Sequence, residues 1–174
     1  MSIETVVTEI PDTAKDIRLN FSNLLQDQVS GLTEQQIKAI IYAVAISVVP
    51  SNAIKTLMAS FEEELDESLV RGAHVASGLM SMNNIYYRFV HLGNDHELSA
   101  MNPGLRMQGM RTHGIDETLF ELMSLAISAI NGCGMCIQAH IKTLKAQGAE
   151  LQTIQMSAKI AAVLNAMNQV NFKK

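Results

Sequence analysis

The sequence predicts an all-α fold in a single domain that spans residues 1–174. Of all residues, 48% are hydrophobic but only 5% are aromatic, with no tryptophan and 11 methionines. This composition favours helices, because strands prefer aromatic and β-branched residues. Apolar residues also recur at helical spacing along most of the chain. A chain of this length can bury a proper core and gives one domain as the natural count.

The first half of the chain contains clear helix start and stop signals. Residues 1–30 hold short apolar stretches broken by Pro11 and predict one or two short helices. Thr33, with Gln36 three positions later, fits the capping-box pattern at a helix start. The helix that follows ends at Pro50, because the residue before a proline is disfavoured in the helical conformation.

Two further helices are expected before the middle of the chain. Ser51 or Asn52 can cap a short helix. A long helical pattern then runs from Ser68 to about His91. Residues 93–115 are rich in turn-forming residues and predict connections with short helical turns.

Residues 117–130 predict a helix that is capped by Asp116 and apolar nearly all round, which indicates burial on most sides. Glu121 lies in the middle of this helix. A carboxylate in apolar surroundings needs a partner, or it becomes protonated. Glu121 is therefore the one unexpected charge in the chain.

The next helix carries both cysteines of the protein. A break at residues 131–132 places Cys133 at its start, so that Cys133 and Cys136 are i and i+3, and Cys136 and His140 are i and i+4. Side chains at these separations share one helical face. The apolar residues of the same helix fall on that face too, at Ile137, Ile141 and Leu144. We therefore expect a CxxC at the N-terminus of a buried helix.

The final helix is predicted from about Glu150 to Val170. Asn83 and Asn131 are related by an offset of 48 residues, and both follow an apolar helical run. The offset suggests an internal duplication whose first copy lacks the thiols.

A dithiol and an imidazole on one helical face indicate redox chemistry. The thiolate is the reactive form of cysteine, and a helix N-terminus favours it. His140 can accept the proton of Cys136, and a hairpin of the two helices could bring Glu121 to orient His140. The second cysteine would then resolve an oxidised intermediate by forming the disulfide. Apolar walls would favour an apolar disulfide or peroxide substrate.

Each of these groups also has a structural interpretation. Zinc sites and inert buried pairs also contain CxxC, but zinc normally takes four ligands, and here one histidine lies near one cysteine pair. Glu121 can equally be a paired structural carboxylate. The other histidines are most simply surface or hydrogen-bonded residues, and the methionines are core residues first. These histidines are His74, His91, His96 and His113.

Charge and hydropathy exclude several classes of protein. The net charge of −4 argues against a nucleic-acid partner, which calls for a clustered basic face. No segment offers the ~20 apolar residues that a membrane span requires. The N-terminus carries acidic residues and an early proline instead of the basic start and long apolar run of a signal peptide, so we do not expect a signal peptide. We therefore expect a cytoplasmic protein, where closely spaced cysteines favour redox or metal chemistry.

The spacing of the candidate residues resembles the active-site pattern of the alkylhydroperoxidase AhpD family, of the carboxymuconolactone decarboxylase-like superfamily. Glu121 is followed after eleven residues by Cys133 and Cys136, and after three more by His140. The stretches MNNIYYR (82–88) and NPGLRM (102–107) are also similar to the family.

The resemblance implies an all-α fold with two similar halves and a homotrimer. It implies weak peroxide reduction and recycling of the oxidised peroxiredoxin AhpC, with Cys133 and Cys136 as redox disulfide and His140 and Glu121 as proton relay. Electrons would come from dihydrolipoamide on a lipoylated dihydrolipoamide acyltransferase, reduced in turn by dihydrolipoamide dehydrogenase. No bound cofactor and no metal are expected. Cys136 would face the peroxide, and Cys133 would exchange with the outside partner.

One position departs from part of that family. A subset has a second histidine between the cysteines, where this chain has Met135. Direct peroxidase activity would then be weaker than disulfide exchange. Two alternatives follow: a disulfide reductase or adaptor without significant peroxidase activity, and a non-catalytic redox sensor. A lactone decarboxylase is disfavoured, because that reaction needs no CxxC.

Overall fold

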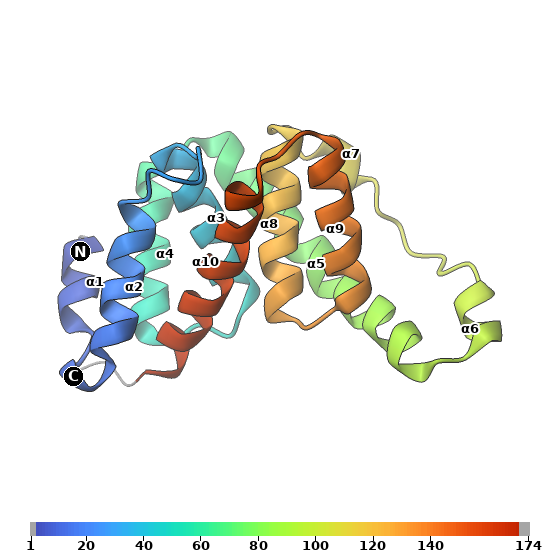
Figure 1. Cartoon of the computed structure of the whole chain (residues 1–174), viewed down its shortest axis with the longest axis horizontal. Coiled ribbons are helices and arrows are strands. Elements are labelled where there is room, and N and C mark those ends of the chain that lie inside the picture. The colour runs from blue at the N-terminus through green and yellow to red at the C-terminus, as the bar shows by residue number, and fades with distance from the viewer. Residues whose placement is uncertain (1–2, 171–174) are drawn as a thin grey trace.

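The computed structural model describes residues 3–170, and these residues form ten α-helices and one short 3-10 helix without any strand (Figure 1). The all-α prediction is confirmed. In the first half the elements are α1 (Ile3–Glu9), η1 (Asp12–Ala14), α2 (Lys15–Leu25), α3 (Glu34–Ser47), α4 (Asn52–Glu64) and α5 (Glu67–Gly93). In the second half they are α6 (His96–Ala100), α7 (Gly109–Thr112), α8 (Glu117–Ile130), α9 (Gly134–Ala146) and α10 (Leu151–Gln169).

The helix starts lie where the sequence signals predict them. Thr33 accepts a hydrogen bond from the backbone N–H of Gln36 at 3.2 Å, and the Gln36 side chain accepts one from Thr33 N at 2.9 Å, so the capping box is confirmed. Ser51, not Asn52, caps α4. Asp116 caps α8 by accepting from Leu119 N at 2.9 Å. These side chains satisfy backbone donors that a helix start leaves unpaired.

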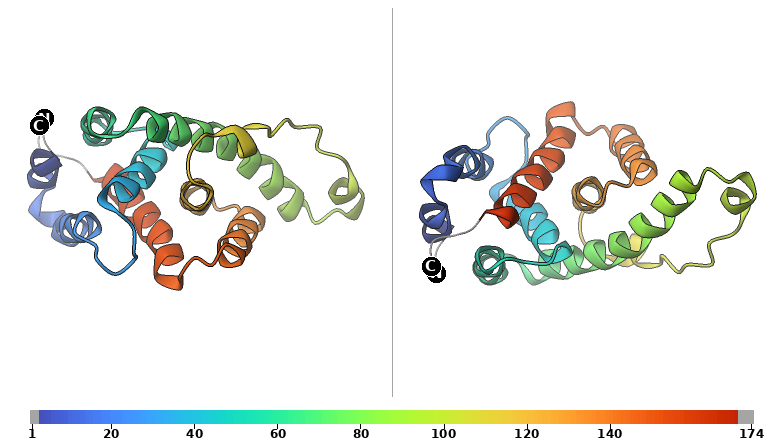
Figure 2. Two further views of the ribbon diagram at one scale, coloured as in Figure 1. Left: turned by 90° about the horizontal axis from the view of Figure 1, so that it is seen from above. Right: turned by 90° about the horizontal axis from the view of Figure 1, so that it is seen from below.

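Helix α8 lies at the centre of the molecule. Seen end-on in Figure 2, it is surrounded by α3, α5, α9 and α10, and it contacts all four. Nine residues of α8 are buried in this packing, because apolar and small residues cover nearly the whole circumference of the helix. The predicted burial of this helix is confirmed, and its two largest buried side chains, Phe120 and Leu122, are each 1% exposed.

The helices repeat as two similar sets. Helices α3 and α8 each have 14 residues, α4 and α9 each have 13, and each set continues into a longer helix, α5 or α10. The N-caps Thr33 and Asp116 are 83 residues apart. The predicted offset of 48 residues was therefore wrong: Asn83 lies within α5, whereas Asn131 follows the end of α8.

The long helix α5 runs along the bundle and then past it, and α6 lies at the far end of the projecting part (Figures 1 and 2). Within the bundle, Gly72 allows a close approach, since a Cβ atom there would lie 2.7 Å from the Ile115 side chain. In the C-terminal third of α5, Ile85, Phe89 and Leu92 are 57–73% exposed. Their spacing places them on one face of the helix.

Candidate active site

The turn between α8 and α9 sets the position of the two cysteines. Gly132 has a φ of +65°, a conformation that side chains with a Cβ atom rarely adopt, and it turns the chain directly after Asn131. Cys133 N then donates to the Ser128 carbonyl at 3.1 Å. Cys133 is thereby placed at the N-cap of α9, at the first turn of the helix.

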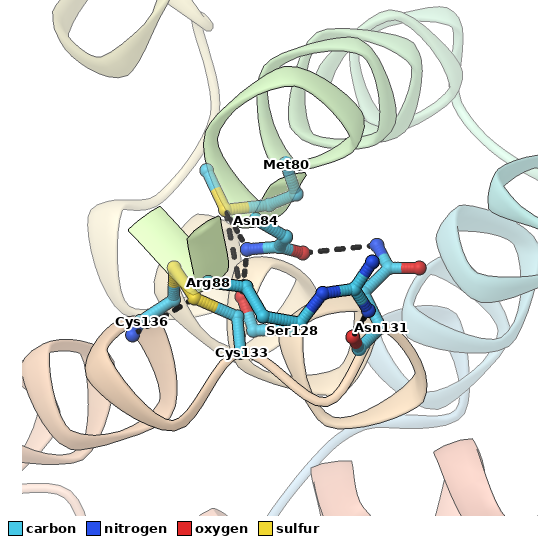
Figure 3. Close-up of a disulfide and its surroundings, with 7 residues drawn as sticks. All are labelled: Met80, Asn84, Arg88, Ser128, Asn131, Cys133 and Cys136. Carbon is cyan, nitrogen blue, oxygen red and sulfur yellow. Dashed lines mark hydrogen bonds between the residues drawn. A yellow bond between two sulfur atoms is a disulfide. The ribbon is translucent and has the colours of Figure 1, made fainter. Parts of the chain in front are cut away.

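The two cysteines form a disulfide, and their Cα atoms are 5.3 Å apart. The backbone N–H of Cys136 donates to Cys133 Sγ at 3.3 Å, so the sulfur caps the helix as the hydroxyl of a serine does at an ordinary helix start (Figure 3). The unpaired N–H groups and the dipole at this helix end stabilise negative charge. When the disulfide opens, the site therefore favours a thiolate on Cys133.

Glu121 and His140 meet across the α8–α9 hairpin. His140 Nδ1 lies 2.8 Å from Glu121 Oε2, and the two side chains are only 8% and 14% exposed. The unexpected carboxylate of α8 thus has the imidazole as its partner. A carboxylate on Nδ1 fixes the ring orientation and leaves Nε2 for the other side of the ring.

A pocket of about 270 Å³ opens beside the disulfide. Cys136 and His140 both line it, and its apolar walls include Met80, Tyr87 and Met110. The two sulfurs differ in access: Cys136 is 8% exposed and lines the pocket, whereas Cys133 is fully buried and does not. An apolar molecule that enters the pocket therefore reaches Cys136.

A polar network joins the cysteine turn to α5. Asn84 Nδ2 donates to Ser128 Oγ at 2.9 Å, and Asn84 Oδ1 accepts from Asn131 Nδ2 at 2.9 Å (Figure 3). The Arg88 guanidinium also donates to the carbonyl of Asn131. This network holds the end of α8 and the start of α9 in place.

The sequence alone did not predict this network: Arg88 could equally line an interface or be a packed or solvated residue. Asn84 and Arg88 belong to the stretch MNNIYYR, and the resemblance of this stretch to the AhpD family is the sequence feature that points to them. Their partners Ser128 and Asn131 lie more than 40 positions away in the chain, so only the fold brings them together.

Two of the four other histidines make contacts that account for them structurally. His113 is 4% exposed and stacks on Phe120, with ring centroids 4.0 Å apart. His74 Nε2 lies 3.3 Å from the hydroxyl of Tyr42.

Among residues 3–170, no group of three or more His, Cys, Asp or Glu side chains is placed to hold a metal ion. Within the same range, no helix combines the length and apolarity needed to cross a bilayer.

Comparisons with known proteins place the chain in a family. The protein from Coxiella burnetii (strain RSA 493 / Nine Mile phase I) named alkyl hydroperoxide reductase AhpD is 44% identical over 170 residues, which is 97% of this chain and 96% of that protein. The chain belongs to the AhpD family. Further AhpD relatives include those of Acidobacterium capsulatum, 41% identical over 98% of this chain and 92% of the relative, and Brucella anthropi, 40% identical over 96% and 94%.

The model of the carboxymuconolactone decarboxylase family also matches residues 97–172. This segment contains Glu121, both cysteines and His140. The family model therefore matches the segment of this AhpD family member that carries both the disulfide and the imidazole–carboxylate pair.

Proposed function

We propose that the chain is an antioxidant, thiol-dependent alkyl hydroperoxide reductase. The observation that carries the proposal is a single pocket in which a disulfide sulfur, Cys136, lies beside an imidazole that is held by a carboxylate. The names of the relatives, at 40–44% identity over nearly the whole chain, support the same class of reaction.

The reaction uses the dithiol form of the pair. His140 takes the proton of the Cys136 thiol, and Glu121 stabilises the imidazolium that forms. The Cys136 thiolate attacks the terminal oxygen of the hydroperoxide, so that an alcohol leaves and Cys136 becomes a sulfenic acid. Cys133 then attacks Cys136, releases water and closes the disulfide.

The disulfide must be reduced from outside, and we assign this step to dihydrolipoamide. The apolar pocket suits an aliphatic dithiol, and no bound cofactor takes part. The donor would be the lipoyl group of a dihydrolipoamide acyltransferase, with dihydrolipoamide dehydrogenase upstream. The second substrate we assign is the oxidised peroxiredoxin AhpC, which the same dithiol would reduce by disulfide exchange.

Burial suggests which sulfur the reductant attacks. The family resemblance assigns exchange with the outside partner to Cys133, but Cys133 is fully buried in the disulfide form. We propose instead that the incoming thiolate attacks Cys136 through the pocket. Cys133 then leaves as a thiolate at the start of α9, where the N–H of Cys136 already points at its sulfur.

For the assembly we propose a homotrimer of single-domain subunits that acts in the cytoplasm. The exposed apolar face formed by Ile85, Phe89 and Leu92 supports the association. A row of large apolar side chains on a projecting helix is typical of a contact surface.

The decisive test is steady-state reduction of tert-butyl hydroperoxide by the purified protein with a dihydrolipoamide regenerating system. Turnover should disappear in both Cys133→Ser and Cys136→Ser. A disulfide that dihydrolipoamide reduces rapidly, without peroxide turnover, would instead establish a disulfide reductase or adaptor, which Met135 between the cysteines favours. No reaction with either compound would leave a redox sensor.

A further inference from the structure

Asn83 is a buried amide at the active-site pocket with no structural task. It is 5% exposed and lines the pocket together with Cys136 and His140. Its Oδ1 atom has no hydrogen-bond partner among the described residues. Burying an amide oxygen without a partner destabilises a fold, so such a group calls for an explanation.

The neighbouring residue shows the contrast. Asn84 uses both ends of its amide, donating to Ser128 and accepting from Asn131. Two asparagines adjacent in α5 therefore differ in role: Asn84 fixes the cysteine turn, whereas Asn83 lines the pocket that Cys136 also lines. In the described part of the chain, the other buried side-chain polar atoms without a partner are Ser124 Oγ and Ser157 Oγ, and neither residue lines this pocket.

We propose that Asn83 binds the hydroperoxide group of the substrate; this inference rests on the proposed function. An amide offers an acceptor, Oδ1, and a donor, the N–H of Nδ2. A hydroperoxide, R–O–O–H, has the complementary pair: its inner oxygen accepts from the Nδ2 N–H, and its terminal O–H donates to Oδ1 once the amide has turned this buried atom toward the pocket. The apolar walls at Met80, Met110 and Met135 would hold the alkyl group.

The amide acts on the charge that the reaction creates. As the Cys136 thiolate attacks the terminal oxygen, an S–O bond forms, the O–O bond breaks, and the electron pair moves to the inner oxygen. The N–H of Asn83 stabilises this developing alkoxide until the His140 imidazolium protonates it to the alcohol. The terminal oxygen keeps its hydrogen in the sulfenic acid and leaves as water when Cys133 closes the disulfide.

The test separates the two half-reactions in Asn83→Leu, which keeps the branching and the number of side-chain heavy atoms but removes the amide. Reduced protein is mixed with tert-butyl hydroperoxide in a stopped-flow instrument, and disulfide formation is followed. We expect the oxidation rate constant to fall about 100-fold, as for loss of a donor to a developing oxyanion. Reduction of the disulfide by dihydrolipoamide, which involves no peroxide, should keep its wild-type rate.

Stability and thiol reactivity distinguish substrate binding from a structural role. Asn83→Leu should have an unchanged or raised Tm, since it removes an unsatisfied buried polar atom, whereas the matched control Asn84→Leu should lower the Tm. Alkylation of reduced Cys136 by iodoacetamide should be equal in Asn83→Leu and wild type.

A wild-type oxidation rate in Asn83→Leu would overturn the inference while leaving the proposed function intact, and so would an equal loss in both half-reactions with a lowered Tm. If peroxide fails to oxidise even the reduced wild-type protein, the proposed function and this inference fall together.

Discussion

Glu121 brings a carboxylate into the mostly buried middle of α8, and its partner His140 makes this position chemically useful. In Glu121→Gln the amide can still hydrogen-bond to Nδ1, but it cannot stabilise an imidazolium by charge. We expect peroxide oxidation of the reduced protein to slow by about 10–100-fold, as for a weakened general base. Stopped-flow oxidation measures this, and Glu117→Gln, an exposed carboxylate of the same helix, should match wild type.

Unequal access of the two sulfurs gives a second prediction at the residue scale. In Cys133→Ser and Cys136→Ser, the single remaining thiol should be alkylated by iodoacetamide about 10-fold faster when it is Cys136, because that thiol lines the pocket. Mass spectrometry over time measures both rates. Serine already caps the corresponding helix α4 at Ser51, so Cys133→Ser should fold. Faster alkylation of Cys133 would instead support Cys133 as the cysteine that exchanges with the outside partner.

The sequence predicted the contact between some site residues but not the roles of others. The meeting of Glu121 and His140 followed from two helices joined by a two-residue break, since a hairpin was the simplest geometry. The separate roles of Asn83 and Asn84 did not follow, because both are asparagines on one helix. Only the three-dimensional positions of Ser128, Asn131 and the pocket distinguish them.

At the scale of elements, helix ends were well predicted because a cap depends on residues three apart. Long-range ties were not predicted. The loop between α2 and α3 is one case: Asp27 Oδ2 accepts from Ser30 N at 2.9 Å, and the Ser30 carbonyl accepts from Thr153 of α10, 123 positions away.

Asp27 makes this loop sensitive to acid. Burial raises the pKa of Asp27, but hydrogen bonds from Ser30 and from Val29 N, together with Lys159, outweigh burial and hold the pKa below its ordinary value of 3.8. The carboxylate therefore stabilises the fold above pH 3.8, and this contribution is lost as the pH falls through the lowered pKa.

In Asp27→Asn the free energy of unfolding at pH 7 should fall by about 1 kcal/mol, a value reduced for solvent screening. The difference from wild type should narrow as the pH falls below 3.8. Urea unfolding at pH 7 and pH 3 measures both effects. Glu63→Gln, an exposed carboxylate on α4, serves as the control. A difference that stays constant with pH would show that the carboxylate charge is not responsible.

At the scale of the whole molecule, composition and periodicity were sufficient for the all-α class. The offset of the internal repeat was predicted wrongly, because helix lengths and cap positions repeat between the two sets, whereas the cysteines, His140 and Glu121 occur only in the second set. Ser51 accepts from Ile54 N at 3.4 Å in the first set, where Cys133 accepts from Cys136 N at 3.3 Å in the second. Matching asparagines could not reveal this correspondence, since they are not part of it.

The exposed apolar face of α5 supplies a prediction about assembly. A charge at Phe89, in the middle of the exposed apolar face, would be costly to bury against another subunit. Phe89→Glu should therefore shift the mass measured by light scattering from trimer to monomer. Val49→Glu changes a side chain that is 91% exposed and lies beside the C-terminal end of α10, where Asn168 Nδ2 donates to the Val49 carbonyl, and it should leave the mass unchanged. A monomeric wild-type protein would contradict the proposed trimer.

The burial of Cys133 also has a kinetic consequence. If the oxidant and the reductant both reach the disulfide pair at Cys136, they must take turns, and no complex holding both can form. Initial rates should then follow a ping-pong pattern, with parallel lines when reciprocal rate is plotted against reciprocal peroxide concentration at several dihydrolipoamide concentrations. Excess dihydrolipoamide should inhibit competitively with respect to peroxide, because it occupies the pocket of the form that peroxide needs.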